Sequence, residues 1–313
     1  MKLTSEVLKE LVVKPGAAAG LGRRGTGSLA TAWPGDGPGG PKEVAEQDLR
    51  LFVEELAEAQ DRLWASATRA LLVVIQAQDA AGKDGTIKHV MSGVNPQGCR
   101  VHSFKQPSSA ELSHDFLWRY GTVLPALGEI AIFNRSYFEE VLVVRVHPEL
   151  LGHQPGAAEA GPFWRRRYQD INAFERHLQR NGTSILKIFL HVSKEEQRRR
   201  LLDRLDDPRK YWKFSEADLA ERQRWHDYQS AYEEVLGATS TSWAPWYVVP
   251  ADHKYLLRAL VGGLVVHAIE TLDLRTAEPS PERLAALARA REQLLSEGAD
   301  GRLPSPTTAR PAG

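Results

Sequence analysis

Residues 71–87 read Leu71-Leu72-Val73-Val74-Ile75-Gln76-Ala77-Gln78-Asp79-Ala80-Ala81-Gly82-Lys83-Asp84-Gly85-Thr86-Ile87. An apolar, β-branched run enters a loop of small residues, which leads into good helix formers. This order predicts a phosphate-binding loop at the carboxyl end of a buried strand. Gly82 and Gly85 let the backbone approach an anion closely, because neither carries a Cβ. Free N–H groups at the start of the next helix would face the phosphates, and Lys83 adds a positive charge.

The match to the general P-loop pattern is incomplete at two positions. Ala77 stands where the pattern has Gly, and Asp84 stands where it has Ser or Thr. The hydroxyl that usually helps to hold Mg²⁺ is therefore missing, and Asp79 inside the loop is the obvious replacement. On this segment alone an ordinary glycine-containing turn after a core strand remains the alternative, because short motifs have many false matches.

The composition limits the class of protein. The 313 residues suffice for one large α/β domain or two small ones, and 40 Lys+Arg balance 40 Asp+Glu. A general nucleic-acid or membrane-surface binder would more often show a basic excess. Cys99 is the single cysteine, which fits a reducing compartment. Because no signal peptide and no apolar run of about eighteen residues occurs, we expect a soluble, cytoplasmic protein without a membrane partner.

Strand-like and helix-like segments alternate along the chain, which predicts a mostly parallel sheet with helices on both faces. The segment 141–146 has strand propensity but follows the preceding strand too closely for a parallel crossover, so we expect a buried helix there. The predicted strands are 71–77, 101–104, 130–133, 184–192 and 246–249. The other predicted helices are 1–13, 42–68, 83–91, 109–123, 163–180, one that opens at the capping box 193–196, 215–236, 252–272 and 281–296.

Charged and polar residues follow the predicted strands where parallel strands end at one edge, which is where ligands bind in open α/β sheets. They are Asp79, Lys83, Lys105, Asn134 and Arg135. Phosphoryl transfer needs charge neutralisation and alignment, which such a set supplies. Glu139 and Glu140 lie one turn beyond Arg135, where they either reach a metal or simply favour the helix dipole.

The run from Arg198 to Lys213 holds seven basic residues in sixteen. It is either a solvated helix with i,i+4 ion pairs or a basic lid that closes over a polyanion and excludes water.

Several longer motifs resemble family-2 polyphosphate kinases, over about residues 42–275. The motifs are residues 78–88, 93–98, 133–136, 212–215 and 244–252. The resemblance implies a P-loop kinase-like, three-layer α/β/α fold with a mostly parallel five-stranded sheet and a helical lid. It implies Mg²⁺-dependent, reversible phosphoryl transfer between inorganic polyphosphate and nucleotides, with Mn²⁺ as an alternative metal. The Phe133-Asn134-Arg135-Ser136 form is similar to the class III subgroup, which phosphorylates AMP and ADP.

The resemblance also implies residue roles and a homo-dimer or homo-tetramer. The implied catalytic residues are Asp79, Lys83 and Arg135, and the implied metal ligands are Asp79 and Glu139. The implied phosphate-binding residues are Ala81, Gly82, Lys83, Asp84, Gly85, Thr86, Lys105, Arg135, Arg204, Arg209 and Lys213. We also predict nucleotide contacts, without a motif to support them, at Asn95, Asp115, Trp118 and Asn134.

The predicted domain organisation has three parts. They are an N-terminal helix with a flexible Gly/Pro-rich arm (1–41), a P-loop kinase-like domain (42–298) with a basic lid at about 195–236, and a disordered tail (299–313). The chain departs from the family at Ala77 and at Tyr137, where this subgroup is expected to have His.

Two other functions remain open at this stage, and neither is excluded by the motifs alone. One is an ATP-dependent nucleotide kinase, and the other is a non-enzymatic polyphosphate- or nucleic-acid-binding protein. The long basic tract favours a linear polyanion as phosphoryl donor, and the expected partner nucleotides carry adenine, with guanine as the alternative base.

Overall fold

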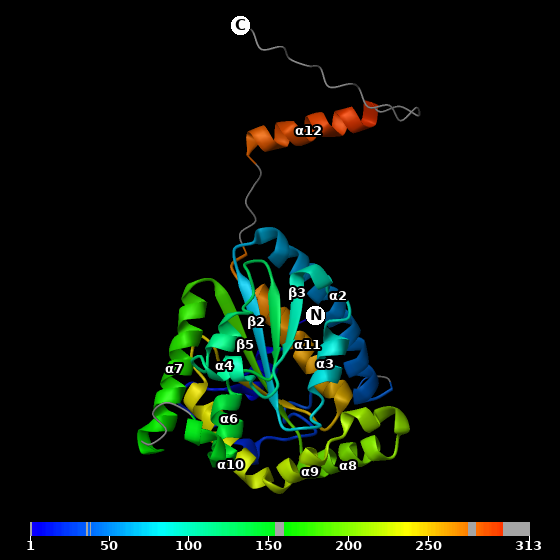
Figure 1. The fold of residues 1–313 in the computed structure, drawn as a ribbon. Helices are drawn as coiled ribbons and strands as arrows, with labels where there is room; N and C mark the ends of the chain where they lie inside the picture. Colours follow the sequence, from blue (N-terminus) through cyan, green and yellow to red (C-terminus); the bar gives the residue numbers. More distant parts are fainter. Residues whose placement is uncertain (1, 36, 38, 154–159, 275–279, 297–313) are drawn as a thin grey trace. The chain divides into compact units, whose positions relative to one another are not determined.

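Five strands of the central sheet are parallel, and a short sixth strand pairs antiparallel at one edge. The computed structural model describes residues 2–35, 37, 39–153, 160–274 and 280–296 (Figure 1). The strand order is β1-β6-β5-β2-β4-β3. The strands are β1 Val12–Val13, β2 Ala70–Ala77, β3 Cys99–Ser103, β4 Ile130–Asn134, β5 Thr183–His191 and β6 Trp246–Pro250. The sheet thus has six strands rather than the predicted five.

Strand β2 lies at the centre of the sheet, and each of its residues is buried. Its neighbours hold it in register along its whole length, with Leu71 opposite Ile130 and Ala77 opposite Leu190. A strand covered on both faces is expected to be apolar at every position rather than at alternate ones. The continuous apolar run after residue 70 is therefore the signature of this central place.

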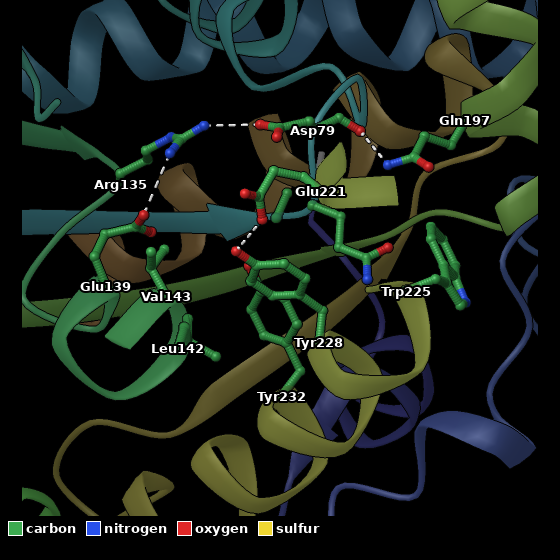
Figure 2. Close-up of a pocket in the computed structure, with 12 residues that line it drawn as sticks. Asp79, Arg135, Glu139, Leu142, Val143, Gln197, Glu221, Trp225, Tyr228 and Tyr232 are labelled. Carbon is green, nitrogen blue, oxygen red and sulfur yellow. Dashed lines mark hydrogen bonds and ion pairs between the residues drawn. The ribbon is translucent and has the colours of Figure 1, made fainter. Parts of the chain in front are cut away.

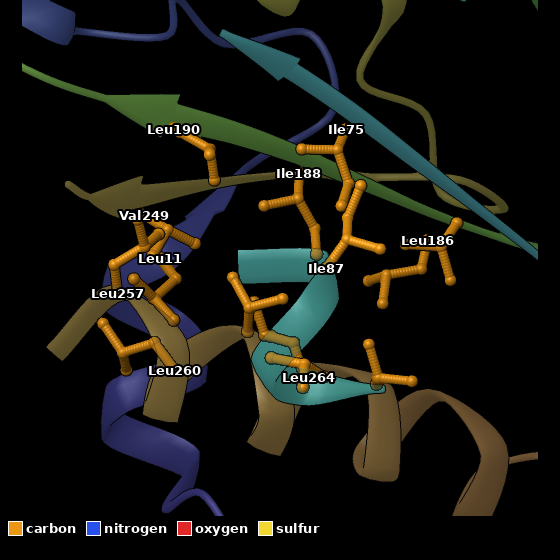
Figure 3. Close-up of a cluster of buried hydrophobic side chains, with 14 of the residues drawn as sticks. Leu11, Ile75, Ile87, Leu186, Ile188, Leu190, Val249, Leu257, Leu260 and Leu264 are labelled. Carbon is orange, nitrogen blue, oxygen red and sulfur yellow. The ribbon is translucent and has the colours of Figure 1, made fainter. Parts of the chain in front are cut away.

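Helices cover both faces of the sheet, which confirms the predicted three-layer α/β/α arrangement. Leu71, Val73 and Ile75 belong to the core under one set of helices, and Leu72 and Val74 belong to the core under the other. Figure 3 shows Ile75 in the first core. The first set is α1 Ser5–Leu11, α2 Pro41–Ser66, α3 Lys83–Val90 and α11 Lys254–Glu270. The second set is α6 Glu139–Val146, α7 Ala160–Arg180 and α10 Trp225–Thr239.

The ambiguous segment 141–146 lies in helix α6, as predicted, but two predicted helices are interrupted. The segment 109–123 forms only α4 (Ser109–Leu112) and α5 (Trp118–Gly121), because the Asp115 carboxylate accepts the N–H of Leu117 between them. The segment 215–236 divides at Arg224 into α9 (Glu216–Gln223) and α10, and α10 continues past Gly237. The remaining segments are α8 Lys194–Leu205 and the 3₁₀ helices η1 Leu21–Arg23, η2 Pro96–Gly98, η3 Pro148–His153 and η4 Pro208–Lys213.

Part of the N-terminal segment packs against the rest of the fold, although its Gly/Pro-rich composition predicted a flexible arm. Ala19, Leu21 and Leu29 are buried. Arg24 donates to backbone carbonyls at the end of α1, and the Glu233 carboxylate accepts the N–H groups of Gly20 and Leu21 at 2.7 and 2.8 Å. The Arg24 and Glu233 side chains therefore satisfy backbone groups in a segment whose composition suggested a solvated loop.

The described residues divide into two units, one that extends to Leu274 and one beyond it. In the second unit the structure describes the helix α12 (Pro281–Ser296), as predicted, while the predicted tail at 299–313 lies outside the described residues. Among the described helices, none combines the length and the apolar character that crossing a membrane would require.

Lys187 lies in the middle of β5 with no exposed surface. Its Nζ donates to Glu175 Oε2 and to the carbonyl of Thr239, both at 2.6 Å, and the Tyr137 hydroxyl donates to Glu175 Oε1 at 2.9 Å. Burial lowers the pKa of Lys187 and raises the pKa of Glu175, and the attraction between the two charges opposes both shifts. Tyr137, at the position where the resemblance predicts His, thus completes a buried network joining β5 to α7 and α10.

His147 follows α6 and joins it to α9 and α10. Its Nε2 lies 2.9 Å from Glu221 Oε1, its Nδ1 lies 2.9 Å from Glu149, and the Tyr228 hydroxyl donates to Glu221 at 2.6 Å. Burial disfavours the charged imidazole, but the hydrogen bonds to Glu221 and Glu149 outweigh it and raise the pKa of His147.

We expect Glu175→Ala to lower the free energy of unfolding by about 3–5 kcal/mol, because it leaves the buried Lys187 cation without its carboxylate. Urea denaturation measures this. The control Glu195→Ala removes a surface pair at 3.3 Å and should change stability by less than about 0.5 kcal/mol. A Glu175→Ala protein within about 1 kcal/mol of the wild type would contradict a charged pair in the core.

A raised pKa means that His147 stabilises the fold fully below its unfolded pKa of about 6.5, and that this contribution is lost as pH rises through the higher folded pKa. We therefore expect His147→Ala to lower the Tm by about 2–4 °C at pH 5.5 and by much less at pH 9. Calorimetry at both pH values, with the exposed His226 replaced by Ala as control, measures the difference. Equal losses at the two pH values would show that the imidazole is not charged in the fold.

Candidate active site

The loop between β2 and α3 has the backbone of an anion site. Ala80 and Gly82 have φ values of 60° and 108°, so the chain turns sharply before the helix begins. Among the described residues no side chain caps the N-terminus of α3, so none of them competes with a ligand for its first N–H groups. Ala77 is the last residue of β2 and is extended and buried, so a Cβ is tolerated at the position where the general P-loop pattern has Gly.

Arg135 brings the end of β4 to this loop. Its Nη2 donates to Asp79 Oδ1 at 2.7 Å, and its Nη1 donates to Glu139 Oε2 at 3.3 Å (Figure 2). Gln76, with its amide turned to satisfy both neighbours, donates to Glu139 Oε1 at 2.9 Å. The Lys83 ammonium donates to the carbonyl of Ala77 at 3.0 Å. Residues from two strand ends and two helix starts therefore meet at one edge of the sheet.

The charges at this edge perturb one another. Burial, and then the Arg135 charge, lower the pKa of Lys83, whereas Asp79 and Glu139 oppose the shift. Burial raises the pKa of Glu139, against the attraction of Arg135 and Lys83. The Glu139 carboxylate in turn is the main cause of a raised pKa at Arg135. Such mutual perturbation is common where groups are arranged to bind or react.

A groove of about 480 Å³ opens beside the loop and is strongly basic. Among its described lining residues, nine are Lys or Arg and three are Asp. The cations come from α3, α8, η4 and α11 and from the turn that follows β4. They are Lys83, Lys88, Arg135, Arg200, Arg204, Lys210, Lys213, Lys254 and Arg258.

Lys88, Lys254 and Arg258 escaped the prediction from sequence. Lys254 and Arg258 lie one turn apart at the start of α11, where cations oppose the helix dipole. This unfavourable placement of two cations, just after a strand end, could have indicated from the sequence that they bind an anion. Burial, and then the nearby charges of Arg200, Arg199 and Arg258, lower the pKa of Lys254. The groove thus carries positive charge that its own carboxylates leave uncompensated.

A second, smaller pocket of about 40 Å³ adjoins the Asp79–Arg135 pair (Figure 2). Glu139, Glu221, Tyr228 and Tyr232 line it. A water needs about 10–15 Å³, so this pocket has room for a water or two but not for a nucleobase. The two pockets share Asp79 and Arg135.

The structure brings most of the predicted phosphate-binding residues to the groove but not all of them. Arg204 and Lys213 line it, whereas Lys105 is exposed after β3 and Arg209 pairs with Asp207 at 3.0 Å with 89% of its side chain exposed. Neither Lys105 nor Arg209 is among the described lining residues.

The predicted nucleotide-binding residues are scattered. Asn134 donates to Asp84 Oδ1 at 2.6 Å and so lies beside the loop. Asn95 accepts the N–H of Gln97 at the start of η2, Asp115 accepts the N–H of Leu117, and Trp118 stacks on His114 at 3.9 Å. Those three make local contacts and line neither of the two pockets.

Asp79 and Glu139 fit a divalent metal that also binds substrate. Both carboxylates lie on one guanidinium, and Mg²⁺ in phosphoryl-transfer sites is commonly held by one or two carboxylates together with substrate phosphates and water. Within the described ranges no cluster of three or more His, Cys, Asp or Glu side chains could hold a metal. The donor set therefore fits a metal that the substrate helps to hold rather than a permanent structural ion.

Comparison with known proteins agrees with this geometry. The model of the family polyphosphate kinase 2 matches residues 40–277. An ADP-polyphosphate phosphotransferase of Rhodopseudomonas palustris is 52% identical over 81% of this chain and 89% of its own length. An AMP/ADP-polyphosphate phosphotransferase of Meiothermus ruber is 46% identical over 77% of this chain and 86% of its own length.

The fold leads to the same family. The crystal structure of polyphosphate kinase 2 from Arthrobacter aurescens TC1 superposes with a TM-score of 0.80 at 37% identity, over 93% of this chain and 99% of that one. Fold, motifs and relatives thus agree over most of the chain, and the chain belongs to the polyphosphate kinase 2 family.

Proposed function

We propose that this enzyme transfers phosphoryl groups reversibly between inorganic polyphosphate and adenine nucleotides, converting AMP to ADP and ADP to ATP. The observation that carries the proposal is the groove in which nine cations adjoin the phosphate loop and Asp79. The relatives named for AMP and ADP support the choice of acceptors. A guanine nucleotide is a further candidate acceptor, since one relative is named as a putative GDP-polyphosphate phosphotransferase.

The proposed mechanism uses positioning and charge rather than a strong nucleophile. Lys83 and the N-terminus of α3 bind the phosphoryl group that moves, and Arg135 neutralises charge as the group passes between oxygens. Asp79 and Glu139 would hold Mg²⁺, for which Mn²⁺ is a substitute. When bound, the metal would neutralise the phosphate oxygens and align the two substrates. The attacking group is already an anionic phosphate oxygen, so no general base is needed.

The groove suits an inorganic chain better than a nucleoside triphosphate donor. Its described lining contains no Phe, Tyr or Trp on which a donor nucleobase could stack, and Leu257 is its one large apolar residue. An ATP-dependent nucleotide kinase would need a base pocket for the donor as well as for the acceptor. The second candidate function is therefore less well supported.

A lid is part of the proposal, and its moving part is shorter than the predicted 195–236. The first half of α8 is bonded to the phosphate loop through Gln197 and Arg200. Helix α10 is packed in the core, and Arg224 at its start donates to the carbonyl of Val146. We propose that residues 201–223 close over the polyphosphate and limit hydrolysis by water.

We also propose a cytoplasmic location and a homo-dimer or homo-tetramer. The single cysteine, Cys99, supports a reducing compartment. Light scattering of the purified protein gives the oligomeric state directly.

Incubation of AMP with polyphosphate and Mg²⁺, without ATP, should produce ADP and then ATP. Separation of the nucleotides by chromatography measures this, and ADP or GDP in place of AMP defines the range of acceptors. Formation of ADP from AMP only when ATP is supplied would favour the nucleotide-donor enzyme instead.

Asp79→Asn and Lys83→Ala should each lower kcat by about a hundredfold or more, the usual cost of removing a preorganised electrostatic group. Steady-state rates with polyphosphate and ADP provide the measurement. The control Lys42→Ala removes an exposed surface pair with Glu46 and should leave the rate unchanged. If either variant retained most of its activity, the assigned roles would be wrong.

A further inference from the structure

Arg200 of α8 is a buried cation whose donors are all used within the protein. It has 5% of its side chain exposed. Its Nε donates to Glu196 at 2.6 Å, its Nη1 donates to the carbonyls of Ala80 and Ala81 at 3.1 and 2.7 Å, and its Nη2 donates to those of Ala251 and Asp252 at 2.6 and 3.0 Å. A guanidinium has five N–H donors. These five acceptors occupy all of them, so none remains for a phosphate.

The carbonyls that Arg200 holds belong to two loops that border the groove. Ala80 and Ala81 lie in the phosphate loop, and Ala251 and Asp252 join β6 to α11, which carries Lys254 and Arg258. The Arg200 side chain therefore fixes the phosphate loop relative to α11, the helix that supplies two cations of the groove. A point charge such as a lysine could not do this, because its three donors lack the planar fork.

The direction of these bonds determines which backbone groups face the substrate. In a trans peptide the C=O and the N–H point in opposite directions. Holding the Ala81 carbonyl toward Arg200 therefore turns the N–H of Gly82 away from it. Ala80 has a φ of 60°, a region that non-glycine residues rarely adopt, and the bond to its carbonyl helps to keep it there.

Gln197, one turn before Arg200, extends the same row of contacts. Its Nε2 donates to the carbonyl of Asp79 at 3.1 Å, so α8 holds three consecutive carbonyls of the loop. Its Oε1 accepts from Arg222 of α9 at 2.8 Å. The backbone beneath the Asp79 carboxylate is thus linked directly to the segment that we propose closes as a lid.

We propose that Arg200 and Gln197 are positioning residues for phosphoryl transfer. They act through the carbonyls of residues 79–81, which hold the loop in its anion-binding shape, and not through contact with polyphosphate. The inference rests on the proposed role of the loop, and it separates Arg200 from Arg204, Lys210 and Lys213, which line the same groove.

Arg200→Lys is the sharpest test, because it keeps the charge and removes the fork. We expect kcat to fall by about 10–100-fold, since a displacement of about 1 Å can cost this much, while KM for polyphosphate changes by less than about threefold. Gln197→Leu should lower kcat by a smaller factor without removing a charge. The control is Arg199→Ala, since Arg199 lies on the solvent side of α8 and pairs with Glu196 and Asp203.

Hydrogen exchange of the folded proteins provides a readout that does not depend on turnover. Peptides covering residues 78–84 should exchange about tenfold faster in Arg200→Lys than in the wild type, while peptides from β4 and β5 stay unchanged. If Arg200 instead bound polyphosphate, Arg200→Lys would keep kcat and the exchange rates, and Arg200→Ala would raise only KM for polyphosphate. An Arg200→Lys protein with unchanged kcat and exchange rates, or an Arg200→Ala protein in which only KM for polyphosphate rises, would overturn the proposal.

The two proposals can fail separately. A wild-type protein without polyphosphate-dependent turnover would refute the proposed function, and the exchange experiment would still report whether Arg200 holds the loop. If the wild type is fully active and residues 78–84 exchange at the same rate in Arg200→Lys as in the wild type, the positioning role alone is refuted.

Discussion

The burial of β2 on both faces and both edges is the constraint on which the rest of the structure depends. Eight consecutive residues are covered, so helices must pack above and below and strands must pair on either side. Parallel neighbours reached by helical crossovers meet this requirement, and they place the carboxyl ends of the five parallel strands at one edge. The loop after β2 and the turn after β4 then lie next to each other, which is why Asp79 and Arg135 are in contact.

Electrostatics at that edge follow from where the backbone places cations. The chain has no formal net charge, yet its groove gathers nine cations against three carboxylates. Crowding and burial lower the pKa of Lys83 and of Lys254. A bound polyanion would relieve this repulsion, so affinity for a chain of phosphates is a consequence of how the cations are held. Arg135 pairs with both Asp79 and Glu139, so it lies where the basic groove meets the two carboxylates that we propose as metal ligands.

The basic residues of α8 and η4 illustrate how similar side chains acquire different roles. Arg199 forms surface pairs with Glu196 and Asp203, and Arg200 holds carbonyls of the phosphate loop. Arg204 donates to the backbone carbonyl of Lys213 and to the Asp218 carboxylate. Arg209, further along, is almost fully exposed beside Asp207. Neighbouring positions on a helix point in different directions. One run of positive charges therefore contains a surface ion pair (Arg199), a buried side chain bonded to backbone carbonyls (Arg200) and a residue that lines the groove (Arg204).

The sequence by itself determined the alternation of strands and helices, the phosphate loop, and the residues Asp79, Lys83 and Arg135 that meet there, because these depend on local pattern and on the rule that parallel strand ends share an edge. Only the tertiary structure decided that Lys254 and Arg258 enter the groove, that Lys105 and Arg209 stay outside it, that Arg200 binds backbone, and that Val12 and Val13 add a sixth strand. Each of those facts depends on which segments, far apart in the chain, come into contact. The free energy of such a contact depends on distances and burial, which no local pattern of residues contains.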